Sequence, residues 1–141
     1  MNSNNIKKTK DINQNGMSEK DLWDYSLYYD IRLDDIINIE QVNSKQTGNY
    51  IVNIDSNYNR NGTHWVGIIK LQDIIFYYDP FGIYSPIKFN TKTVYNNIQF
   101  QKNEEKYCGL YSLMFLYFGE NIKNMDDFEQ VLNELKEYEI K

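Results

Sequence analysis

Apolar residues along this chain fall into short runs separated by polar, turn-forming residues. Three runs in the middle of the chain, NYIVNID, HWVGIIKL and DIIFYYD, combine β-branched and aromatic residues and are joined by short polar connections. A fourth run, TVYNNIQFQ, comes after a loop that begins with Pro-Phe-Gly. The pattern predicts four β-strands, of which the first three are adjacent in one sheet.

Helical patterns lie toward the two ends of the chain. Ser18, followed three positions later by Asp21, is a capping-box-like start and predicts a first helix. Residues 110–118 are almost continuously apolar, which indicates a buried helix. Residues 31–42 fit a helix or a strand equally well. An amphipathic helix covering one face of the domain is predicted at the end, because these residues recur at helical spacing: Phe128, Val131, Leu132, Leu135 and Tyr138.

The patterns predict a flexible tail over residues 1–17 and one domain over residues 18–141. The first 17 residues lack apolar periodicity and are rich in Asn and Lys. A chain of 141 residues can bury a core without disulfides or metals. No internal repeat is visible, so the sequence indicates a single folding unit.

Composition narrows the classes of function. The net charge is −5, and without a basic stripe we do not expect nucleic acid to be an obligatory partner. The one Cys cannot form an internal disulfide, which favours a reducing intracellular setting. The longest apolar run is too short to span a bilayer, so we expect a soluble protein without a membrane partner. One His and one Cys could hardly close a zinc site, and no phosphate-binding glycine loop is present, so we expect no cofactor.

Three residues nevertheless suggest chemistry: His64 at the start of a predicted strand, Asp79 at the end of the next, and Cys108 at the head of the buried helix. Each has a structural alternative. A lone Cys among apolar residues is usually core, a single His is often a hydrogen-bonded structural residue, and Asp before Pro commonly forms turns.

Strand pairing favours a joint role for His64 and Asp79. If their strands form an antiparallel hairpin with a tight turn near Gln72 and Asp73, we expect His64 directly opposite Asp79 at one sheet edge. A carboxylate there could hold the imidazole in one tautomer, as in a nucleophile, base and orienter set.

Cys108 is predicted to lie at a helix N-terminus, where the helix dipole and free N–H groups stabilise a thiolate. The same N–H groups could donate to an oxyanion. A further donor is required for a good oxyanion hole, and Gln101, seven residues before Cys108, is the candidate.

These segments together resemble the adenovirus-type cysteine proteases, the viral maturation enzymes called adenains, and their relatives in virophages and polinton-like elements. The resemblance rests on GTHWVGIIK, IIFYYDPFG, Gln101 and YCGLYSLMFL, in that order, and covers roughly residues 49–118. The more distant Ulp-type SUMO-deconjugating proteases share the His, Asp, Gln and Cys order. The Pro-Phe-Gly after the acid and the CGLYSLMFL run favour the viral branch.

The resemblance implies an α+β, papain-related fold, with a mixed sheet packed on a central helix that begins at the catalytic Cys. By position, His64 would be the general base, Asp79 its orienter and Cys108 the nucleophile. Gln101 would be the oxyanion-hole side chain, with Gln99 as the competing choice. Trp65 either flanks the substrate or belongs to the core.

The implied activity is a cysteine endopeptidase that cleaves viral capsid precursor proteins during virion maturation. The protein would act as a monomer inside the virion and in the cytoplasm or nucleus of the host cell. An isopeptidase acting on ubiquitin-like modifiers and an inactive binding protein with a protease fold are the alternatives.

Two features depart from the adenovirus enzymes. Those enzymes carry Glu where this chain has Asp79, so the shorter carboxylate must come closer to the imidazole. They also use an activating peptide tethered through a second Cys, and they slide on viral DNA. With one Cys and a negative net charge, this chain is not expected to require either activator.

Overall fold

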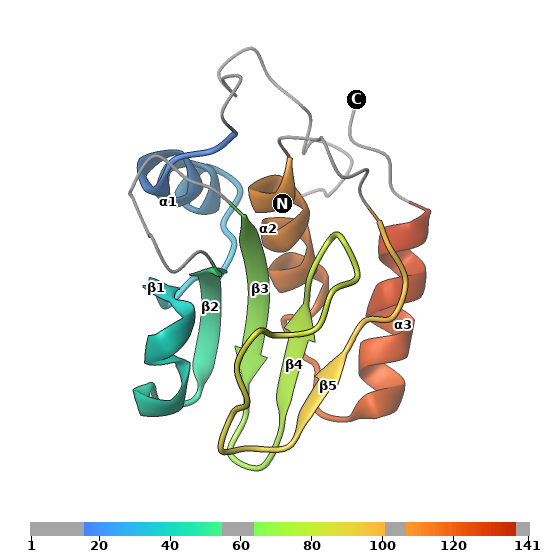
Figure 1. The fold of residues 1–141 in the computed structure, drawn as a ribbon. Helices are drawn as coiled ribbons and strands as arrows, with labels where there is room; N and C mark the ends of the chain where they lie inside the picture. Colours follow the sequence, from blue (N-terminus) through green and yellow to red (C-terminus); the bar gives the residue numbers. More distant parts are fainter. Residues whose placement is uncertain (1–15, 55–63, 101–106, 138–141) are drawn as a thin grey trace.

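The computed structural model describes residues 16–54, 64–100 and 107–137 (Figure 1). In chain order these residues form helix α1 (Glu19–Tyr28), strand β1 (Asp35–Asn38), a 3-10 helix (Ile39–Ser44), strands β2 (Gly48–Asn53), β3 (Trp65–Lys70), β4 (Ile75–Tyr78) and β5 (Thr93–Tyr95), and helices α2 (Cys108–Phe118) and α3 (Met125–Lys136). None of the helices in these residues is both long enough and apolar enough to cross a membrane.

The five strands form one mixed sheet in the order β1-β2-β3-β4-β5. The two central pairings, β2 with β3 and β3 with β4, are antiparallel, whereas β1 and β5 are added in parallel at the edges. The predicted adjacency of the first three runs is therefore confirmed.

Both faces of the sheet are covered, and the alternation along each strand divides its side chains between two apolar clusters. One cluster joins the sheet to the three α-helices, and Figure 1 shows α2 lying behind β3 and β4. The other cluster joins the opposite face to the 3-10 helix and to the loop between β4 and β5, through Val42, Ile87 and Phe89. Burial on both faces explains why the strand sequences are nearly continuous apolar runs.

Residues 31–42, which fitted two kinds of element, contain parts of both. Asn38 ends β1 and caps the 3-10 helix: its side chain accepts a hydrogen bond from the Glu40 N–H (2.8 Å), and its own N–H donates to Gln41 Oε1 (2.8 Å). This capping box ends the strand by starting a helical turn.

The expected register of β3 and β4 is wrong by two residues. Gly67 pairs with Tyr78 and Lys70 with Ile75, so this register extended would place His64 opposite Phe81 and not opposite Asp79. The hairpin closes on a two-residue loop at the predicted Gln72 and Asp73, with the Leu71 N–H donating to the Ile74 carbonyl (2.9 Å), but a pairing centred on that loop does not place His64 opposite Asp79. A shift of two residues preserves the face on which each side chain lies.

The predicted N-terminal tail, residues 1–17, also includes a residue that the structure places in the core. Met17, assigned to the tail, is 1% exposed and belongs to the core around α1 and α2. Its carbonyl accepts a hydrogen bond from Trp65 Nε1 (2.8 Å). The first helix itself is confirmed, with Ser18 as its N-cap and a complete capping box with Asp21.

Candidate active site

His64 and Asp79 lie in contact at one end of the sheet. His64 directly precedes β3 and Asp79 directly follows β4, so the hairpin brings their side chains together. His64 Nε2 is 2.7 Å from Asp79 Oδ1. The Asp79 side chain is fully buried, while that of His64 is 17% exposed. The expected proximity is therefore present, through a diagonal relation between the strands and not a directly opposed pair.

The turn after β4 fixes the Asp79 carboxylate. The Phe81 N–H donates to Asp79 Oδ1 (2.8 Å), and the Gly82 N–H donates to the Asp79 carbonyl (2.8 Å), which closes a turn through Pro80. Gly82 has φ +74°, a conformation that disfavours other residues. The Pro-Phe-Gly sequence thus serves to orient the acid.

Phe81, to which the sequence interpretation gave no role, covers one face of the imidazole. Its ring is stacked on that of His64, with centroids 4.4 Å apart and planes inclined by only 6°. The imidazole is therefore held at one edge by a carboxylate and on one face by an aromatic ring.

Cys108 is the first residue of α2 and is buried. Its sulfur accepts a hydrogen bond from the Trp65 N–H (3.4 Å), the residue after His64. A hydrogen bond also joins the Cys108 and His64 side chains. Since His64 Nε2 faces Asp79, Nδ1 is the ring nitrogen left for the thiol.

The environment of His64 favours its charged form. Burial lowers the pKa of His64, but hydrogen bonds and charge interactions with Asp79 and Cys108 outweigh it and raise the pKa from 6.5 to about 9. At neutral pH the imidazole is consequently protonated, with a carboxylate on one side and the Cys108 sulfur on the other.

The remaining site residues predicted from the sequence are Trp65, Gln101 and its competitor Gln99. Trp65 is 0% exposed and part of the core, so its ring does not line an open substrate surface. The structure instead uses its backbone N–H, at the sulfur. Gln101 lies outside the described residues, and the competing Gln99 is exposed between β5 and that segment.

Sequence interpretation missed Asn96, a buried residue directly after β5. Its side-chain amide contacts the backbone N–H and carbonyl of Asp79. The available signal was an Asn inside the run TVYNNIQFQ that was predicted as one strand, but nothing in the sequence showed that this strand pairs with the one that ends at Asp79.

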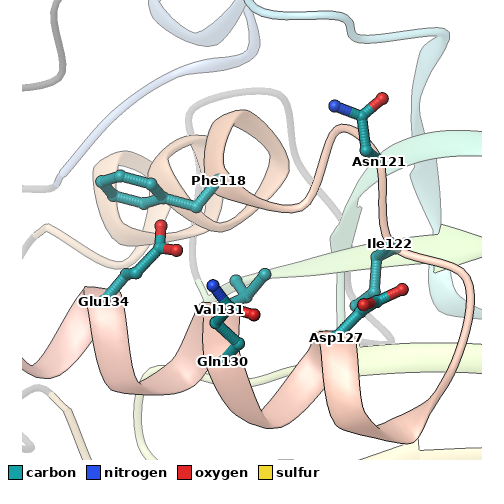
Figure 2. A pocket seen from close by; sticks show the side chains of 7 residues that line it. All are labelled: Phe118, Asn121, Ile122, Asp127, Gln130, Val131 and Glu134. Carbon is teal, nitrogen blue, oxygen red and sulfur yellow. The ribbon is translucent and has the colours of Figure 1, made fainter.

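A groove of about 270 Å³ lies elsewhere, between the end of α2 and helix α3. In Figure 2 the Glu134 side chain of α3 points toward the Phe118 ring. The groove is lined by Phe118, Asn121, Ile122, Asp127, Gln130, Val131 and Glu134. None of these is a candidate catalytic residue. Within residues 16–54, 64–100 and 107–137, no cluster of three or more His, Cys, Asp or Glu side chains could hold a metal ion.

No protein-family model matches the chain, and no curated protein matches it in sequence. Its fold does match solved structures, among them the crystal structure of the ASFV pS273R protease. That match has a TM-score of 0.50 at 14% identity and covers 96% of this chain and 71% of the other. Likeness at this identity concerns the fold alone. The chain accordingly has an α+β fold related to that of papain, as expected, with its mixed sheet packed on a helix that begins at Cys108.

Proposed function

We propose that this protein is a cysteine protease in which Cys108 is the nucleophile, His64 the acid and base, and Asp79 the residue that orients His64. One observation carries the proposal: the only His of the chain contacts both a buried carboxylate and the only Cys, at the head of the central helix. The fold likeness to the ASFV protease supports the same assignment.

The geometry suggests how the reaction would proceed. The Cys108 sulfur, with its proton on His64, attacks the scissile carbonyl and forms a C–S bond. His64 then donates its proton to the leaving amine as the C–N bond breaks. Water, deprotonated by His64, attacks the acyl carbon, the C–S bond breaks, and the carboxylic acid product leaves. The carboxylate of Asp79 stabilises the imidazolium and fixes its tautomer.

The negative charge that develops on the scissile carbonyl oxygen must be stabilised by hydrogen-bond donors. The first N–H groups of a helix have no acceptor within the helix, so those at the start of α2 are suited to this role. Gln101 is proposed as the side-chain donor, on the resemblance of its position.

The substrates are proposed to be viral capsid precursor proteins, cleaved within the chain during virion maturation. The proposal rests on the resemblance to adenovirus-type proteases and on a viral protease as a structural neighbour. It includes action by a monomer, in the virion and in the host cytoplasm or nucleus, without an obligatory nucleic acid or other cofactor.

The test uses purified wild-type protein and Cys108→Ala with the capsid proteins encoded beside it, followed by intact mass. Loss of the nucleophile should lower cleavage by about a thousandfold or more, while thermal unfolding and circular dichroism remain close to wild type. Cleavage that persists undiminished in Cys108→Ala would rule out the proposed nucleophile.

A parallel incubation with electrophilic ubiquitin and SUMO probes separates the endopeptidase from the isopeptidase. An adduct on Cys108 in wild type, absent in the Ala variant, would favour the isopeptidase. Iodoacetamide kinetics address the inactive alternative, because an activated thiol reacts near neutral pH and an ordinary thiol reacts mainly above about pH 8.5.

A further inference from the structure

Asn96 stands where β5 separates from β4. The β4–β5 pairing ends with a backbone hydrogen bond from the Asn96 N–H to the Tyr77 carbonyl (3.3 Å), and the next one between the two segments comes only at the Phe100 N–H and the Pro80 carbonyl (2.7 Å). Between these two hydrogen bonds β5 has ended, whereas the other segment continues into Asp79. Asn96 is 1% exposed, so its amide group must find partners inside the protein.

At the next position the Asn96 side chain, and not the backbone, pairs with Asp79. Its Oδ1 accepts from the Asp79 N–H (2.8 Å), and its Nδ2 donates to the Asp79 carbonyl (2.7 Å). The second Nδ2 hydrogen goes to the Ile98 carbonyl (3.0 Å). A side-chain amide has the same donor and acceptor as a peptide group, so Asn96 extends the ladder by one step past the end of the strand.

This contact acts on the residue that faces the imidazole. Both backbone polar groups of Asp79 are held by Asn96, and its Oδ1 is held by the Phe81 N–H. These contacts hold the backbone position and the direction of the Asp79 carboxylate in addition to its hydrogen bond with His64.

We propose that Asn96 is a positioning residue of the active site, which aims the Asp79 carboxylate at His64 by clamping the Asp79 backbone. The inference rests on the proposed function for its kinetic consequence, but not for its effect on His64. A purely structural Asn96 would contribute to stability and leave the protonation of His64 unchanged.

The experiment compares wild type with Asn96→Ala, with Asn96→Leu, which keeps the size of the side chain, and with Asn97→Ala as a control. Asn97 is the exposed neighbour of Asn96. NMR titration follows the imidazole directly, because His64 is the one His of the chain. The two Asn96 variants should move the pKa of His64 from about 9 toward 6.5, and the control should not.

Cleavage kinetics give the second measurement. A misdirected Asp79 should lower kcat by about tenfold to a hundredfold, the scale expected for a displacement of about 1 Å, with KM nearly unchanged. In an Asp79→Ala background, Asn96→Ala should have no further effect on the pKa of His64, because Asn96 acts only through Asp79.

A folded Asn96 variant with an unchanged pKa of His64 would overturn the proposal. So would a further fall in that pKa when Asn96→Ala is added to Asp79→Ala. If neither Asn96 variant folds, Asn96 belongs to the fold alone and the proposal is equally lost. The NMR result does not depend on cleavage, so failure of the protease assignment would be seen separately, in Cys108→Ala.

Discussion

At the scale of single residues, the distinctive feature is an imidazole held from three directions. Asp79 contacts Nε2, Phe81 covers one ring face, and Cys108 provides the remaining hydrogen bond. Burial alone would lower the pKa of His64, so the raised value depends on the charges around it. The largest single contribution should be that of the Asp79 carboxylate, which is fully buried and therefore weakly screened.

Replacing Asp79 by Asn tests this balance. Asp79→Asn keeps the size of the side chain but removes the charge, so the pKa of His64 should fall from about 9 to 6.5 or below as desolvation becomes the dominant effect. The proposed cleavage should decrease at least about a hundredfold, because the amide can favour the wrong tautomer. NMR titration and kinetics measure both. Asp73→Asn, in the exposed β3–β4 turn, is the matched control, and an unchanged His64 pKa in Asp79→Asn would contradict the prediction.

At the scale of elements, the close approach of α2 to β3 positions the thiol. Ser112 Oγ is within hydrogen-bond distance of the carbonyls of Trp65 (3.3 Å) and Cys108 (2.8 Å). Gly67 of β3 lies directly under the helix: a Cβ atom there would be 2.9 Å from Phe115 Cδ2 and 3.2 Å from the Ser112 carbonyl oxygen. Because Gly67 has no side chain, α2 can approach β3 this closely.

Gly67→Ala should therefore push α2 away from β3. We expect a loss of about 1–3 kcal/mol in the free energy of unfolding, as for other overpacked cores, measured by urea denaturation. The proposed cleavage should also fall, since Cys108 moves with the helix. Combining Gly67→Ala with Phe115→Leu should cost less than the two changes added together, because the smaller side chain relieves one clash. Asn133→Ala, on the exposed face of α3, should be close to neutral, and a Gly67→Ala protein as stable as wild type would refute the steric account.

At the scale of the whole molecule, the site couples folding to protonation. Residues 64, 79 and 108 are brought together only when the sheet and α2 have assembled, so the raised pKa of His64 is a property of the folded state. The pKa of His64 is higher in the folded than in the unfolded state, so the interactions of protonated His64 stabilise the fold fully below about pH 6.5. That stabilisation is lost as pH rises toward 9.

The free energy of unfolding should consequently decrease by roughly 3 kcal/mol between about pH 6.5 and pH 9, near 1.4 kcal/mol per pH unit. Urea titrations at half-unit intervals across this range measure the slope. His64→Gln should show little of it, because the titrating group is gone. A wild-type curve that is flat between these pH values would exclude a His64 pKa near 9.

Most elements of the fold, but not their exact pairing, could be predicted from the sequence. Alternating and continuous apolar runs identified β2, β3, β4, α2 and α3, because burial imposes those patterns locally. The observed strand β5 is shorter than the run TVYNNIQFQ that predicted it, because it ends where the Asn96 side chain replaces the backbone as the partner of β4. The turn between β3 and β4 was located correctly, but the expected pairing of His64 with Asp79 was not centred on that turn.

The sequence by itself determined which chemically able residues are present: one His, one Cys, and an Asp that begins a Pro-Phe-Gly turn at a strand end. It also determined that two of them flank a hairpin, because period-two patterns and turn residues act over a few positions. Only the tertiary structure decided that Phe81 stacks on His64, that Asn96 clamps Asp79 and that Trp65 is core. Those contacts join separate strands, loops and helices. Whether they form depends on the strand order, the register and the distance of the helix from the sheet, which no local pattern encodes.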